Sequence, residues 1–176
     1  MAPVSTVACG NDNVGDLLWA LLKDAEAALI ECERPVGLVS LAPGNTVSWD
    51  NCCASGPDQP GGQLWVRLIS IVPQPQGSQT CDVTSNQLRI GVGVVRCMHG
   101  ITEDRSPTAE EMSADTLGTT ADANVLQQAL RCSDLVPSAN KKSFRFEQGL
   151  PQGPQGNCGG FEWTVTVQIG LCKPCA

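Results

Sequence analysis

The stretch FEWTVTVQIGL, from Phe161 to Leu171, alternates apolar and polar residues along its length. Successive side chains of a β-strand point to opposite faces, so this alternation predicts a strand with one apolar and one polar face. The apolar set is Phe161, Trp163, Val165, Val167 and Ile169. We therefore expect a sheet whose core lies on one face, while the other face meets water or a partner.

Other segments supply the partners of this strand. Residues 142–149, KSFRFEQG, alternate in the same way and predict a hairpin with 161–171 through a long, Gly-rich connection. Residues 63–72, QLWVRLISIV, are apolar on both faces near their middle, which indicates a strand inside the sheet. A short edge strand is expected near Thr46–Trp49.

Residues 86–98, NQLRIGVGVVRCM, predict another long strand, with its branched apolar residues on one face. On the opposite face Gly91 and Gly93 leave the backbone bare. We expect another group to pack closely against them.

Two segments carry helical patterns. Apolar residues recur at helical spacing over residues 13–32, and Pro35 and Gly37 end this helix. A second helical segment covers residues 106–132, where Thr108 and Glu111 have the spacing of a capping box. Gly118 is expected to divide this second segment into two helices.

The predicted order is therefore helix, short strand, two strands, helix, two strands. We expect an α+β fold with a mostly antiparallel four-stranded sheet, two helices packed on one face, and loops stapled by disulfides. We expect residues 1–12 to form an N-terminal arm, 13–172 a single domain, and 173–176 a C-terminal tail.

Composition limits the classes of partner. The net charge is −7, with 11 Lys and Arg residues among 176, so an electrostatic grip on nucleic acid phosphates is not expected. No apolar run approaches the roughly 18 residues of a membrane helix, and the first residues lack the pattern of a signal peptide. We expect neither membrane binding nor classical export.

Ten cysteines are unusual in a chain without an export signal, because a cytosol keeps thiols reduced. Their even number favours disulfides, while unpaired buried thiols remain an alternative. Adjacent Cys52 and Cys53 would then bond two different partners. The terminal CKPC, Cys172 to Cys175, leaves open a zinc site shared with Cys52 or Cys53, or a redox site.

Catalytic patterns are weak. The single histidine, His99, follows a predicted strand and is expected at the surface, and the acids between Glu103 and Asp115 suit the start of a helix. No G-x-S-x-G motif and no phosphate-binding loop occur in the sequence. We expect a protein that is not an enzyme and needs no cofactor.

Several landmarks resemble, in order, a family of head-to-tail connector proteins from tailed phages (siphoviruses) of actinobacteria. The most specific is P-G-x-x-x-x-W-D-x-C-C, from Pro43 to Cys53, although the family pattern has Asp where this chain has Asn51. The others are QLWVRL, RIGVGVVRC, SPTAEE, ALRC and GNCGG, and the resemblance extends over residues 16–172. The tail terminator is the family member that fits best.

The resemblance implies a structural protein of the virion neck, assembled in the cytoplasm of the host bacterium. Such proteins form homo-oligomeric rings, usually hexameric, that cap the tail tube and dock on the head connector. Expected partners are further copies of the chain, the major tail tube protein, the connector or stopper protein, and genomic DNA that passes through the lumen without sequence-specific binding. Alternatives are another neck component, such as a stopper or adaptor, or a small zinc-binding or redox protein.

The resemblance also gives a set of disulfide candidates: Cys32, Cys52, Cys53, Cys81, Cys97, Cys132, Cys158 and Cys172. Within the W-D-x-C-C motif, Trp49 is expected to pack into the core and Asp50 to bond nearby backbone amides. Because virions leave the cell by lysis, these thiols could oxidise outside without a signal peptide.

Overall fold

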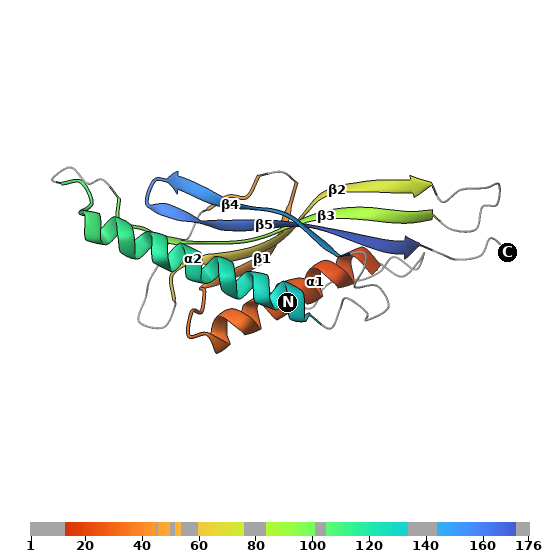
Figure 1. Cartoon of the computed structure of the whole chain (residues 1–176), viewed down its shortest axis with the longest axis horizontal. Helices are drawn as coiled ribbons and strands as arrows, with labels where there is room; N and C mark the ends of the chain where they lie inside the picture. Colours follow the sequence, from red (N-terminus) through yellow and green to blue (C-terminus); the bar gives the residue numbers. More distant parts are fainter. Residues whose placement is uncertain are drawn as a thin grey trace.

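The structure, a computed structural model, describes residues 13–44, 46–49, 52–53, 60–75, 84–100, 105–133 and 144–171. Two helices and five strands follow one another as α1 (Asn13–Glu31), β1 (Leu38–Pro43), β2 (Gln63–Pro75), β3 (Thr84–Cys97), α2 (Ala109–Cys132), β4 (Arg145–Gln155) and β5 (Cys158–Leu171). Both helices cover the same face of one long sheet (Figure 1). The predicted α+β class and this element order are confirmed.

The sheet has five strands in the order β1-β2-β3-β5-β4 and is mixed, because β1 runs parallel to β2 while every other pair is antiparallel. The expectation of a mostly antiparallel sheet therefore holds, and the expected number of four strands is corrected to five. The short edge strand lies at Leu38–Pro43 rather than near Thr46–Trp49, and residues 46–49 have no regular structure. Gly44, with a φ of +77°, follows β1 directly and turns the chain out of the sheet.

The main core lies between the helices and the sheet. From α1 the buried residues are Leu21, Leu22, Ala25 and Leu29. They meet the alternate residues of the strands, including Leu64 and Val66 of β2 and Val92 and Val94 of β3. The apolar face of the helix and the apolar face of the strands therefore pack against each other, as the sequence pattern predicts.

Helix α2 begins with the expected capping box: Glu111 N donates to Thr108 Oγ1, and Thr108 N donates to Glu111 Oε2. The helix is one piece of 24 residues, so the predicted break at Gly118 is wrong. A single glycine costs a helix only about 1 kcal/mol. Here the guanidinium of Arg34, in the segment that follows α1, donates to the Gly118 carbonyl at 2.8 Å, and this tertiary contact supports the helix.

The hairpin of β4 and β5 has a tight connection at Gly156 and Asn157, rather than the long, Gly-rich one expected. Gly156 adopts a φ of +61°, the left-handed conformation that short hairpin turns need. The Pro- and Gly-rich residues before it belong to β4, where register shifts between Phe146 and Gln148 and between Gln152 and Gln155 interrupt the ladder.

One end of the sheet projects beyond the helices (Figure 1). The paired ends of β2 and β3 form part of it. Leu88, opposite Ile71 in the register, still belongs to the main core. Ile71 and Val72 are about half exposed. Among the described helices, none is long and apolar enough to cross a membrane.

Candidate functional site

The W-D-x-C-C segment lies in the connection between two parallel neighbouring strands. Because β1 and β2 run in the same direction, the connection between them, residues 44–62, is a crossover connection. Trp65 and Val95 alternate with residues of the main core, so they point to the face away from the helices. Cys52 packs between them in a second small cluster, which Val47 and Trp49 border.

Two disulfides fasten this crossover to the sheet. Cys97 on β3 and Cys158 on β5 are direct partners in the sheet register, and each bonds one of the two adjacent cysteines. Cys52 joins Cys158 with a Cα–Cα distance of 5.7 Å, and Cys53 joins Cys97 at 4.5 Å. The vicinal pair therefore clamps two neighbouring strands at the same point.

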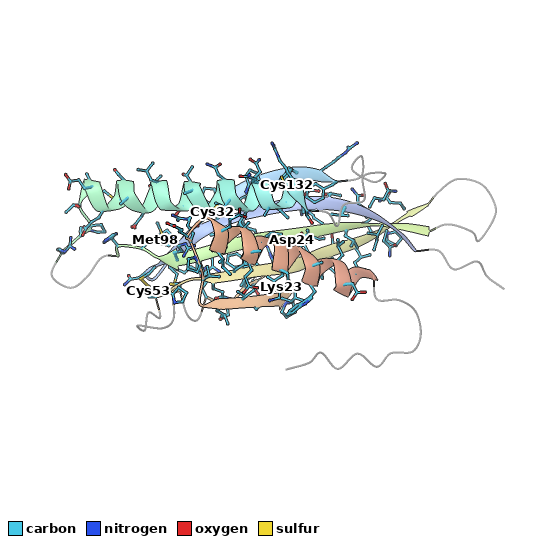
Figure 2. The ribbon with its side chains drawn as sticks, turned by 90° about the horizontal axis from the view of Figure 1, so that it is seen from below. Lys23, Asp24, Cys32, Cys53, Met98 and Cys132 are labelled. Carbon is cyan, nitrogen blue, oxygen red and sulfur yellow. A yellow bond between two sulfur atoms is a disulfide. The ribbon has the colours of Figure 1, made fainter. Side chains whose placement is uncertain are left out.

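The two disulfides differ in exposure. Cys52 is almost completely buried, with 1% of its surface exposed, and Cys158 is partly buried. Cys53 and Cys97 are both exposed. Figure 2 labels Cys53 and Met98, the neighbour of Cys97, at the same end of the molecule. Reagents in solvent therefore reach the Cys53–Cys97 bond more easily.

Of the other cysteine candidates, the two that the structure describes do not take part in this clamp. Cys32 follows the last residue of α1 and Cys132 is the last residue of α2, and both are exposed free thiols (Figure 2). Cys81, Cys172 and Asp50 lie outside the described residues. Trp49 is partly buried against the second cluster.

Beside the clamp, the same face carries a buried ion pair. Trp65 Nε1 donates to Glu162 Oε2 at 2.8 Å, and Arg67 donates to both carboxylate oxygens of Glu162 at 2.6 and 2.9 Å. Glu162 is 5% exposed. Glu162 is one of the polar residues of the alternating 161–171 pattern, yet it is buried. Its carboxylate can be buried because three donors satisfy it.

Gly91 and Gly93 make room for this group. A Cβ on Gly93 would lie 2.3 Å from the Trp65 ring, and one on Gly91 would lie 3.0 Å from both Arg67 and Glu162. The expectation that something packs closely against the bare face of this strand matches these contacts. The sequence did not indicate which residues fill the space.

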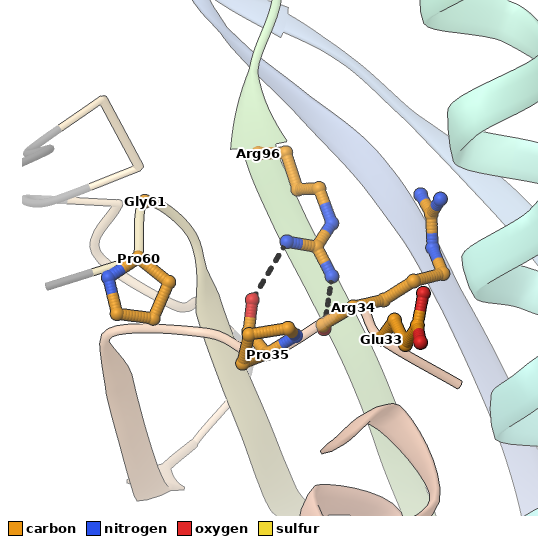
Figure 3. A pocket seen from close by; sticks show the side chains of 6 residues that line it. All are labelled: Glu33, Arg34, Pro35, Pro60, Gly61 and Arg96. Carbon is orange, nitrogen blue, oxygen red and sulfur yellow. Dashed lines mark hydrogen bonds between the residues drawn. The ribbon is translucent and has the colours of Figure 1, made fainter. Parts of the chain in front are cut away.

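A second ion cluster ties α1, α2 and β3 together on the helical side. Asp122, 2% exposed, accepts from Arg34 at 2.5 Å and from Arg96 at 2.6 Å. Arg96 also donates to the backbone carbonyls of Arg34 and Pro35 (Figure 3). The Asp122 hydrogen bond raises the pKa of Arg34 above its ordinary value. Sequence reasoning missed all three residues, since a polar residue inside a helix does not reveal a partner 88 positions away.

The two arginines line a shallow surface depression of about 280 Å³ with Glu33, Pro35, Pro60 and Gly61 (Figure 3). Arg96 is engaged by Asp122 and two carbonyls, and Arg34 by Asp122 and the Gly118 carbonyl. We therefore interpret the Asp122, Arg34 and Arg96 cluster as a structural contact that holds the two helices and β3 together.

His99 lies at the exit of β3, at the surface as expected. Its Nδ1 is 3.0 Å from Asp115 Oδ1, and its backbone N donates to Asp115 Oδ2 at 2.8 Å. Arg105, which precedes α2, donates to both oxygens of Glu111 in the first turn of the helix at 2.7 Å. This hydrogen bond, reinforced by Thr108, lowers the pKa of Glu111 to about 2.

Neither protein-family models nor curated proteins match this chain.

Proposed function

We propose that the chain is a structural protein of the phage neck. In this proposal it forms a ring, hexameric as in the family it resembles, that caps the tail tube and joins it to the head connector. The main support is the ordered set of sequence landmarks around W-D-x-C-C, since that motif is the most specific part of the resemblance. The structure gives this motif a place where it clamps a crossover to the sheet.

The edges of the sheet offer a way to build a ring. In the described part of the chain, β1 and β4 are the outer strands, each paired on one side only. An unpaired edge can accept a strand from another chain. Leu38 and Leu41 on β1 and Leu150 on β4 are exposed apolar side chains near these edges. A contact between β1 of one copy and β4 of the next would be heterologous, and such contacts form a ring when the rotation between copies closes.

The projecting end of the sheet supplies a second contact surface. Ile71 and Val72, in the second half of β2, are exposed apolar residues. In a ring, such an end could contact the tail tube or the connector. The net charge of −7 suits a lumen through which DNA passes without being held.

The ring contact can be tested in solution. Leu41→Glu places a charge at the β1 edge, and Leu117→Glu is the matched control because Leu117 is 71% exposed on α2, away from both edges. We expect light scattering to give a multimer for the wild type and the control, and a monomer for Leu41→Glu. Equal masses for all three proteins would contradict the edge contact.

The position in the neck can be tested in the phage. If the chain caps the tube, loss of its gene should leave tail tubes of uncontrolled length that do not attach to heads. Loss of a stopper or adaptor, the alternative neck components, should leave tails of normal length. Electron microscopy of lysates separates these outcomes, and normal infectious particles would overturn the proposal.

A further inference from the structure

Four sulfur atoms gather where the crossover meets β3 and β5. The Sγ atoms of Cys52, Cys53 and Cys158 all lie within 4.8 Å of one another. The fourth, Cys97, is bonded to Cys53 and lies opposite Cys158 in the register. Three separate parts of the chain thus bring four cysteines to one point.

The three mutually close sulfurs, with Cys97 next to them as the partner of Cys53, approach the ligand set of a tetrathiolate metal site. Zinc binds thiolates at about 2.3 Å in a tetrahedron, which places the sulfurs about 3.8 Å apart. The Sγ atoms of Cys52 and Cys53 are already 3.4 Å apart. Adjacent cysteines rarely bind one ion, because their side chains usually diverge. Here the turn at these two residues directs both sulfurs to the same side.

We propose that the reduced protein binds one thiophilic divalent cation, with Zn²⁺ the best match, through Cys52, Cys53, Cys97 and Cys158. Two of these ligands stand on paired strands, so their backbone is held before the metal arrives. Trp65 and Val95 form an apolar wall behind Cys52, which limits access of water to this side of the site.

A bound metal would hold the crossover on the sheet under reducing conditions, where disulfides do not persist. A reducing cytosol opens disulfides, and the crossover would then lose both of its covalent ties to the sheet. A bound zinc ion would hold the same four residues together during assembly. The metal-bound and disulfide-bonded states exclude each other, because each needs the same four sulfurs.

Conversion between the two states balances with a low-molecular-weight disulfide as oxidant. Each oxidant molecule exchanges with two cysteine thiolates, so that one protein disulfide forms and two small thiolates leave. Two oxidant molecules therefore form Cys52–Cys158 and Cys53–Cys97. The zinc ion leaves as Zn²⁺, with its oxidation state unchanged.

The test uses the full-length reduced protein. We expect native mass spectrometry to find one zinc ion per chain after equimolar zinc is added, and the disulfide oxidant to release it. Cobalt in place of zinc should give the charge-transfer and visible bands of tetrahedral thiolate coordination. A reduced protein that binds no zinc, with its thiols shown to be free, would overturn the proposal.

Alkylation of the wild type then locates the ligands without a variant that could misfold. With zinc bound, Cys52, Cys53, Cys97 and Cys158 should react at least tenfold more slowly than in the metal-free reduced protein. Exposed Cys32 and Cys132 should react equally fast in both. If zinc did not slow the alkylation of these four cysteines, the assignment of the ligands would be contradicted.

Two double variants complete the test. Cys97→Ser with Cys158→Ser should lose zinc, whereas Cys172→Ser with Cys175→Ser should keep it. Loss in the second variant would assign the ion to the terminal CKPC instead. None of these results depends on ring formation, so failure here leaves the proposed neck function untouched.

Discussion

At the scale of single residues, packing on the sheet face away from the helices depends on the small space that Gly91 and Gly93 leave for larger side chains. The Trp65 ring occupies the space that a side chain at Gly93 would need, and its indole N–H donates to Glu162. Two glycines in a strand of branched residues were a visible signal in the sequence. The tryptophan and the ion pair that use the space belong to other strands, so the local pattern could not identify them.

We predict that Gly93→Ala lowers the free energy of unfolding by about 1–3 kcal/mol, the usual cost of overpacking a filled core. The new Cβ would lie 2.3 Å from a buried ring that cannot move freely. Gly153→Ala is the control, because a Cβ there meets nothing within 4 Å. Urea unfolding of both variants measures the difference. Equal stability of the two would contradict this packing.

We predict that the two disulfides open in a fixed order. With limiting dithiothreitol, the exposed Cys53–Cys97 bond should be reduced before Cys52–Cys158, because thiolate attack requires access to a sulfur. Quenching with an alkylating reagent and peptide mass mapping gives the order. Earlier labelling of Cys52 and Cys158 would refute it.

At the scale of helices and strands, the order of elements could be predicted because each has a strong local period. The parallel pairing of β1 with β2 could not, because a six-residue strand does not reveal its partner across a 19-residue connection. The unbroken α2 also went unpredicted, since Arg34 supports Gly118 from a distant part of the chain. In both places long-range contacts decide the structure.

We predict that Asp122→Asn destabilises the protein by about 3–5 kcal/mol, because Arg34 and Arg96 would then face each other without a counter-charge. Glu110→Gln on the exposed face of the same helix serves as control and should cost less than about 0.5 kcal/mol. Chemical unfolding followed by circular dichroism measures both. A loss below 1 kcal/mol for Asp122→Asn would show that the cluster does not hold the helices.

The start of α2 should respond to acid. The Arg105 hydrogen bond holds the pKa of Glu111 at about 2, below its ordinary value of 4.5. The ionised form is therefore favoured in the folded state. Its stabilising effect is complete above about pH 4.5 and is lost as the pH falls toward 2.

NMR titration of the Glu111 carboxyl carbon should give a midpoint near 2 in the wild type. Arg105→Gln removes the largest cause of the shift and should raise that midpoint, while the capping box with Thr108 remains. A wild-type midpoint at or above 4 would contradict the ion pair.

At the scale of the whole molecule, three features fit a ring subunit. In the described part of the chain they are a long sheet whose outer strands β1 and β4 are paired on one side only, an end of that sheet beyond the helices, and a crossover fastened by two disulfides. The sequence placed Cys52 and Cys53 on two different partners, and the structure assigns those partners as Cys158 and Cys97. This choice needs the pairing of β3 with β5, which local sequence does not contain.

The most direct test of the central proposal is a cryo-electron microscopy reconstruction of the intact virion. We predict a ring of this chain, with six copies, between the end of the tail tube and the head connector, and neighbouring copies in contact through the β1 and β4 edges. Density for this fold in the capsid, at the tail tip, or nowhere in the particle would contradict the account.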